Sequence, residues 1–186
     1  MNEGQNENGA VFPRSIVVAG MILLAAAARI APHPWNFTPV GAMALFGGAM
    51  LRDRRAAFLL PLAALFAGDI VLGLYKWMWI VYASFLVSVA IGFWLRGRRT
   101  IWRVGGATLL GSLQFFVVTN FGVWAMGGLY PKTGAGLAAC YVAGIPFFWN
   151  TLAGDAMYAT LLFGGFALAE RFFPALRAVE ASSPEA

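Results

Sequence analysis

Charged residues are scarce in this chain. They make up 11% of its 186 residues, whereas hydrophobic residues make up 60% and aromatic residues 15%. Soluble globular domains carry about 25% charged residues. A surface with so little charge does not suit a domain solvated by water. The composition therefore predicts one domain that lies in a lipid bilayer.

Cysteine and histidine are almost absent, each with a single residue, Cys140 and His33. This excludes an internal disulfide and a cysteine or histidine metal centre. Phosphate-binding loops, zinc-protease motifs and nucleophile elbows are also missing. We therefore expect no cofactor, no metal and no enzymatic activity. Catalysis by a pair of intramembrane aspartates, Asp69 and Asp155, remains an alternative, because such a pair needs only two carboxylates. We expect His33 to be a loop residue and Cys140 a packed hydrophobe.

The net charge of +5 comes from basic residues that cluster between apolar runs. The two main clusters are Arg52, Arg54 and Arg55, and then Arg96, Arg98, Arg99 and Arg103. Short basic clusters of this kind are typical of cytoplasmic loops in membrane proteins. A nucleic-acid surface needs a continuous basic face. We expect no nucleic-acid partner.

The apolar runs predict an all-α membrane protein with six transmembrane helices in one bundle. The predicted spans are 15–31, 39–51, 57–75, 77–95, 104–126 and 150–172. The positive-inside rule then places both termini in the cytoplasm, in a multi-pass protein of the inner membrane. The domain covers 15–172, between a polar cytoplasmic tail at 1–14 and a second cytoplasmic tail at 173–186.

The apolar segment 134–149 is rich in glycine and interrupted by Pro146. A seventh crossing at this point would move Arg171 and Arg177 outside, against the positive-inside rule. We therefore predict an extra short helical or re-entrant segment on the outer side, before the last span.

The second span is unusually short. Thr38 suits an N-cap and Pro39 the first helical position. From Val40 to Leu51 the helix covers only ~18 Å. Either it continues through the following arginines, or its outer end is recessed and leaves a hollow beneath the loop Pro-His-Pro-Trp-Asn at 32–36.

Three polar residues, Asp69, Asn120 and Asp155, lie in different predicted spans at the same depth. Counted at the helical rise, each is ~8–9 Å below the outer surface. Ionisable groups inside a membrane usually face the bundle interior and carry function. We predict an outward-facing pocket beneath the 32–38 loop. Its predicted substrate-binding residues are Asn36, Thr38, Asp69, Asn120, Trp124 and Asp155.

Structural roles compete with this interpretation. Arg29 could form an ion pair with Asp69 and Asp155 that only holds helices together. Asn120 and Gln114 could be interhelical hydrogen-bonding groups. Asn150 or Thr151 could cap the sixth helix.

Three stretches resemble an uncharacterised bacterial family of multi-pass proteins assigned to transport. They are NFTPVGAMALFGG at 36–48, PLAALFAGDIVLG at 61–73, and the run from Phe116 to Phe166. In architecture the chain also resembles the S components of energy-coupling-factor vitamin transporters, six-helix proteins that capture a vitamin from outside. The alanine motif with which S components dock onto their energising module has only a weak counterpart here, Ala27 and Ala31.

These observations predict a substrate-binding and translocation component for uptake of a small polar or vitamin-like molecule. The resemblance to S components implies an ATP-hydrolysing energising module as a partner. A self-sufficient proton- or sodium-coupled transporter that uses Asp69 or Asp155 is an alternative. A structural or assembly subunit is another.

Overall fold

The computed structural model describes residues 14–177, and every regular element in that range is a helix. The all-α class is therefore confirmed. The predicted tails fall largely outside the described residues. The elements are α1 (Arg14–Ala28), α2 (Val40–Met50), α3 (Arg54–Leu72), α4 (Met78–Phe93), α5 (Ile101–Met126), α6 (Gly134–Ala159), the π-helical turn η1 (Thr160–Gly164), α7 (Gly165–Phe172) and the 3-10 turn η2 (Pro174–Leu176).

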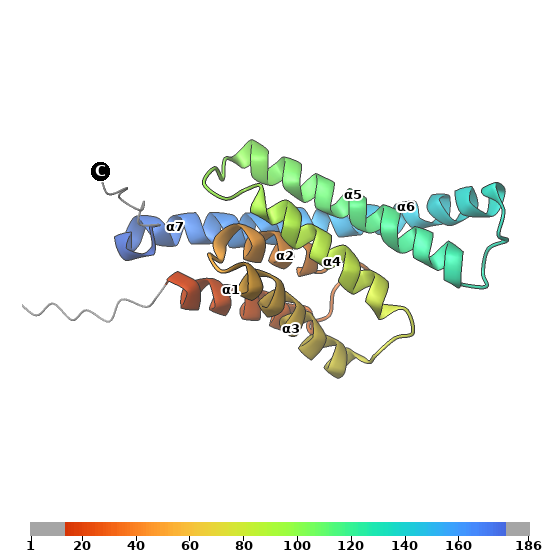
Figure 1. The fold of residues 1–186 in the computed structure, drawn as a ribbon, viewed down its shortest axis with the longest axis horizontal. Helices are drawn as coiled ribbons and strands as arrows, with labels where there is room; N and C mark the ends of the chain where they lie inside the picture. Colours follow the sequence, from red (N-terminus) through yellow and green to blue (C-terminus); the bar gives the residue numbers. More distant parts are fainter. Residues whose placement is uncertain (1–13, 178–186) are drawn as a thin grey trace, which may run out of the picture.

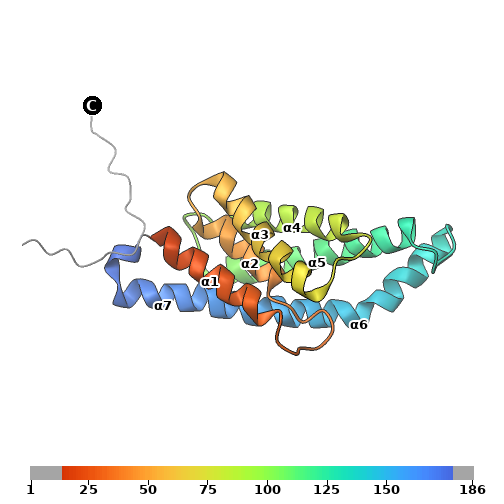
Figure 2. The same ribbon diagram turned by 90° about the horizontal axis from the view of Figure 1, so that it is seen from below.

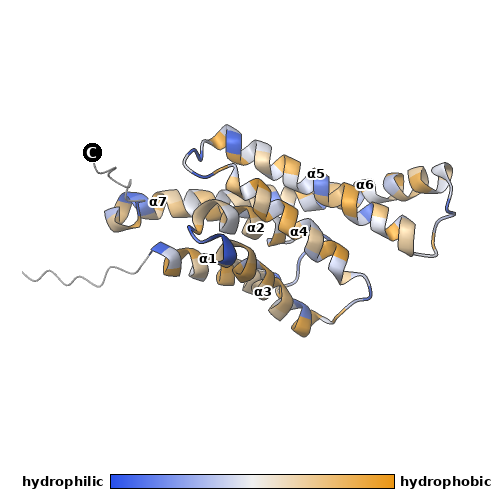
Figure 3. Cartoon of the chain, viewed as in Figure 1, coloured by the Kyte–Doolittle hydropathy of each residue, from blue (hydrophilic) through white to orange (hydrophobic). Residues whose placement is uncertain are grey.

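Three helices are long and apolar enough to cross a membrane, namely Arg54–Leu72, Ile101–Met126 and Gly134–Phe172. The other apolar helices, α1, α2 and α4, are shorter. In Figure 3 hydrophobic residues follow the helices while hydrophilic residues gather at the connections and helix ends. The structure therefore supports a membrane protein, as the composition predicts.

The short helix α2 lies at the centre of the fold (Figures 1 and 2). It packs against α1, α3, α4, α5 and α6. Every residue of α2 except Gly41 is buried. An apolar run without a polar face suits this position, because no side of such a helix needs to meet water.

Glycines allow α2 to cross α4 at backbone contact. A Cβ atom on Gly48 would lie 3.1 Å from the Cα of Gly92 and would clash with the carbonyl of Val89. A Cβ on Gly92 would in turn meet the backbone of Leu45. Small residues permit this close packing of apolar helices. The arrangement fixes α2 in depth and rotation.

The predicted separate segment at 134–149 is wrong. Residues 134–172 form one continuous apolar helix of 39 residues, in which α6 leads through η1 into α7. Pro146 lies inside α6. A proline removes one backbone hydrogen bond, which bends a helix without ending it when its neighbours keep helical geometry. Figure 2 shows α6 curving near its start.

The arginine-rich loops and helix ends meet at one end of the bundle. Glu170 accepts hydrogen bonds from Arg14 at 2.9 Å and from Arg99 at 3.2 Å. These contacts join the start of α1, the loop before α5 and the end of α7. The predicted cytoplasmic sides of three spans therefore lie together.

Candidate functional site

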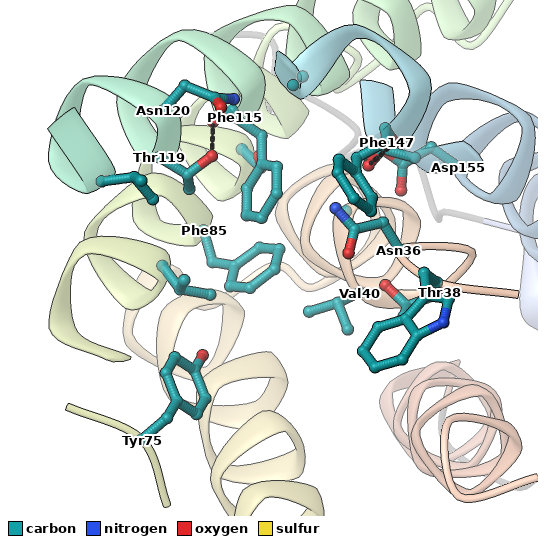
Figure 4. Close-up of a pocket in the computed structure, with 18 of the residues that line it drawn as sticks. Asn36, Thr38, Val40, Tyr75, Phe85, Phe115, Thr119, Asn120, Phe147 and Asp155 are labelled. Carbon is teal, nitrogen blue, oxygen red and sulfur yellow. Dashed lines mark hydrogen bonds between the residues drawn. The ribbon is translucent and has the colours of Figure 1, made fainter. Parts of the chain in front are cut away.

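A cavity of about 780 Å³ lies at the opposite end of the bundle, above the N-terminus of α2 (Figure 4). Its walls come from the 29–38 loop, α2, α4, α5 and α6, with further residues from α3 and from the α3–α4 and α5–α6 connections. The structure thus places a hollow where the sequence predicts a recessed end of the second span.

Four of the six predicted substrate-binding residues line this cavity, and two do not. The lining residues are Asn36, Thr38, Asn120 and Asp155. Asp69 and Trp124 lie outside the lining, whereas Arg29 belongs to it. The predicted polar layer is therefore divided between the cavity and its surroundings.

Asp155, which lies on α6, caps the N-terminus of α2. Its carboxylate is 3% exposed and accepts hydrogen bonds from the Ser112 hydroxyl at 2.7 Å and from the backbone N–H of Ala42 at 3.2 Å. The predicted cap at Thr38 is not formed, since Pro39 occupies the N-cap position without a side-chain hydrogen bond. A carboxylate here meets the positive end of the α2 dipole. It pairs with no arginine among the described residues.

Two glycines make room for this arrangement. A Cβ on Gly41 would lie 2.6 Å from Oδ2 of Asp155, and a Cβ on Gly154 would lie 3.0 Å from the backbone nitrogen of Thr38. The start of α2 and the loop before it are therefore pressed directly against α6. Larger side chains at either position would push the cavity wall apart.

Asp69 forms an ion pair with Arg29, at 2.6 Å between Oδ1 and Nη2. Its second oxygen accepts from the Tyr82 hydroxyl at 2.7 Å, and Arg29 also donates to the Leu65 carbonyl at 3.3 Å. Asp69 is 1% exposed. This cluster joins the end of α1 to α3 and α4, so its geometry matches the helix-holding role rather than direct access to a ligand.

Asn120 does not bridge helices through its amide nitrogen, because that group donates to the Phe116 carbonyl within α5 at 2.8 Å. Gln114 does bridge them. Its amide donates to the Ser88 hydroxyl on α4 at 2.9 Å and accepts from the Ser84 hydroxyl at 3.0 Å. Of the two predicted interhelical residues, Gln114 therefore has that role.

The loop over the cavity is held at several points. His33 contacts the carbonyl of Arg29 through Nε2 at 3.1 Å. Asn150 donates to the carbonyl of Trp35 at 3.0 Å, which ties the loop to α6. Asn36 has a positive φ of 61°, a conformation that asparagine tolerates better than most residues. The predicted helix cap at Asn150 is wrong, because α6 begins at residue 134 and Asn150 anchors the loop instead.

Trp124 shapes the turn between α5 and α6. Its indole N–H donates to the Pro131 carbonyl at 2.9 Å. The Lys132 ammonium donates to the carbonyls of Trp124 and of Gly127, the latter at 2.6 Å. These bonds close the turn at the far tip of the hairpin, so Trp124 has a structural position outside the cavity.

A family model covers nearly the whole chain, from residue 10 to residue 176. The chain belongs to DUF6580, a family of unknown function. Neither a curated protein nor a solved structure matches it. The resemblance to an uncharacterised family is thereby confirmed.

Sequence reasoning missed most of the aromatic lining of the DUF6580 cavity. Phe85 comes from α4, Phe115 from α5 and Phe147 from α6. Their signal is a helical stripe, with lining residues three or four positions apart along one face. On α5 the stripe is Gly111, Phe115, Thr119 and Val123, and on α6 it is Cys140, Gly144, Phe147, Thr151 and Asp155.

A second, smaller cavity of about 390 Å³ lies nearer the arginine-rich end of the DUF6580 protein. It is formed between α5 and the helix that runs from α6 through η1 into α7, with Arg99 at one end and Thr108, Ala156 and Phe163 along it. Within residues 14–177, His, Cys, Asp and Glu form no group of three or more that could hold a metal ion.

Proposed function

We propose that this DUF6580 protein is a membrane substrate-binding and translocation component for uptake of a small polar or vitamin-like molecule. The observation that carries the proposal is the cavity of about 780 Å³, which combines a loop cover, a polar rim and apolar walls. Small-molecule sites commonly have this volume and this mixture of apolar walls with a few polar groups. The proposed role is binding and transfer without a chemical step.

The proposal includes six crossings of the cell's inner membrane, with both termini in the cytoplasm. In this topology α6, η1 and α7 together form the sixth crossing. At 39 residues this helix is ~58 Å long, well beyond the ~30 Å of hydrocarbon. The excess length carries the α5–α6 turn past the outer surface. The short α2 is acceptable because its outer end meets a cavity rather than lipid.

We further propose that an ATP-hydrolysing partner supplies the energy, as the predicted likeness to S components implies. The chain contains no nucleotide-binding motif. The pairing of Asp69 with Arg29 supports this choice over ion coupling through Asp69, because an ion-paired carboxylate has a fixed counter-charge already.

One observation favours the self-sufficient alternative. The cavity near the arginine-rich end provides space in the other half of the bundle, between α5 and α6, which also contribute to the walls of the 780 Å³ cavity, here called the outer cavity. In that alternative Asp155 is the coupling carboxylate, since it lies between the helices that would have to move. A merely structural or assembly role would leave both cavities without a ligand.

Reconstitution in liposomes tests the proposal. The purified chain is offered candidate ligands with and without a proton or sodium gradient, and bound and accumulated ligand are measured separately. We expect binding without accumulation. Accumulation that depends on a gradient would replace the partner-dependent proposal with the ion-coupled one, and failure to bind any candidate would favour the structural role.

A matched pair of variants locates the binding. Asn36→Gly removes a cavity side chain and preserves the positive φ of the loop, because glycine adopts that conformation freely. We expect it to weaken binding at least tenfold. Thr160→Val changes a residue of the inner cavity and should leave outer binding unchanged.

A further inference from the structure

We propose that the ligand of the outer cavity is an uncharged molecule built on a planar aromatic ring. This inference rests on the proposed function, in that the cavity must bind a small molecule at all. Three features of the cavity carry it: compensated charges, aromatic walls and neutral polar groups.

The charges around the cavity already have partners within the protein. Among the lining side chains the guanidinium of Arg29 and the carboxyl group of Asp155 are the strong base and the acid. Arg29 is neutralised by Asp69 at 2.6 Å, and Asp155 is directed at Ser112 and the N-terminus of α2. A charged ligand would lose hydration on entering without finding a free opposite charge, which is costly in an apolar site. An uncharged ligand avoids that cost.

Aromatic rings lie on opposite walls. In Figure 4 Phe85 and Phe115 face Phe147 across the space, and Asn36 extends into it beside Phe147. The Phe85 and Phe115 rings are stacked, with centroids 5.5 Å apart and an interplanar angle of 29°. Aromatic walls of this kind favour an aromatic ligand over a rounded aliphatic molecule, because ring–ring contacts in stacked or edge-to-face geometry add to the free energy gained by burying apolar area.

Neutral polar groups are available to such a ring. Figure 4 shows the Asn36 amide and the Tyr75 hydroxyl directed toward the cavity, and no hydrogen bond joins either to another residue drawn. An amide offers both donors and acceptors, and a phenol offers one donor and an acceptor. Ring nitrogens, carbonyls and amino substituents are the ligand groups that match them.

The test compares compounds that share a ring and differ in charge. The full-length protein in detergent is titrated with nicotinamide, nicotinate and 1-methylnicotinamide, which are neutral, anionic and cationic. A second series uses adenosine, AMP and 1-methyladenosine, and sorbitol serves as a neutral compound without a ring. Binding is read from the rise in melting temperature, which grows with ligand concentration relative to Kd.

We expect the neutral ring compound of at least one series to bind at least tenfold more tightly than its charged relatives and than sorbitol. Phe115→Leu and Phe147→Leu should each weaken that binding, whereas Phe121→Leu, on α5 but outside the cavity lining, should not. Equal or tighter binding of a charged relative or of sorbitol, lost in the two cavity variants, would overturn this inference and leave the proposed function standing. No binding by any compound would overturn the inference and count against the proposed function as well.

Discussion

The carboxylate of Asp155 on α6 accepts a hydrogen bond from the backbone N–H of Ala42, a residue 113 positions earlier in the chain, at 3.2 Å. The opposite end of α2 is capped in a similar way, since the Arg96 guanidinium donates to the carbonyls of Gly48 at 2.9 Å and Leu51 at 2.7 Å. A short central helix is thus held by a carboxyl group at its positive end and by a guanidinium at its negative end. The outer cavity lies directly over the cap that Asp155 forms on α2.

Removal of the Asp155 cap should destabilise the protein. We expect Asp155→Ala to lower the free energy of unfolding by about 1–3 kcal/mol, because two buried donors lose their acceptor. Asp155→Asn keeps one acceptor oxygen and should cost less. Unfolding in mixed micelles at increasing SDS measures both values.

Ser112→Ala is the control for that experiment. It removes the 2.7 Å hydrogen bond from the Ser112 hydroxyl but leaves the Asp155 carboxylate bound to the N-terminus of α2. Its effect should be smaller than that of Asp155→Ala. If Asp155→Ala unfolds at the same SDS fraction as the parent protein, the cap contributes nothing to stability and the residue is free for another role.

The α2–α4 crossing should not tolerate a methyl group. Gly48→Ala would place a Cβ against the carbonyl of Val89 and 3.1 Å from the Cα of Gly92, so we expect a loss of stability of about 1–3 kcal/mol. Gly106→Ala is the matched control, because a Cβ on this helical glycine meets nothing within 4 Å. Alanine there should be neutral or stabilise by about 0.5–1 kcal/mol. Equal effects of the two substitutions would contradict the backbone contact.

The presence of aspartates inside apolar spans could be predicted from the sequence, but the direction in which each one points could not. The depth predicted for Asp155 was counted from a helix start at residue 150, whereas α6 begins at Gly134. Rotation about the helix axis is set by packing against neighbours, and it turns Asp69 toward Arg29 and Asp155 toward α2. The loop over the recessed second span was accessible to prediction because span length depends on the sequence alone.

The boundary predicted between residues 149 and 150 had a larger effect on the predicted site, because α6 continues through it. Treating 134–149 as a separate element detached Phe147 from Asp155, although eight residues of continuous helix place them on neighbouring parts of one face. With the stripe divided, the aromatic wall of the cavity could not be recognised. A proline in a membrane helix is weak evidence for an end, since neighbouring groups can satisfy the freed carbonyl.

A double-mutant cycle should show that Arg29 and Asp69 depend on each other. Asp69→Leu leaves a largely buried guanidinium without its counter-charge, and Arg29→Met leaves the buried Asp69 carboxylate without one, so we expect each single variant to lose about 3–5 kcal/mol. The double variant Arg29→Met with Asp69→Leu should recover much of that loss, because neither charge remains. Tyr82→Phe removes only the 2.7 Å hydrogen bond and should cost about 1 kcal/mol. Additive single effects would mean that the pair is not coupled.

Cysteine labelling should establish which end of the bundle faces the cytoplasm. In a Cys140→Ser background, single cysteines replace the exposed Gly128, in the turn between α5 and α6, and the exposed Arg98, in the loop before α5. The basic clusters predict that the Arg98 side is cytoplasmic. We therefore expect a membrane-impermeant maleimide to label Gly128→Cys in intact spheroplasts and Arg98→Cys only after permeabilisation.

A reporter fused after Arg177 should also read as cytoplasmic, because Arg14 and Arg99 both contact Glu170 at that end. The reverse labelling pattern would turn the outer cavity toward the cytoplasm, and capture of a molecule from outside would then be impossible at this site.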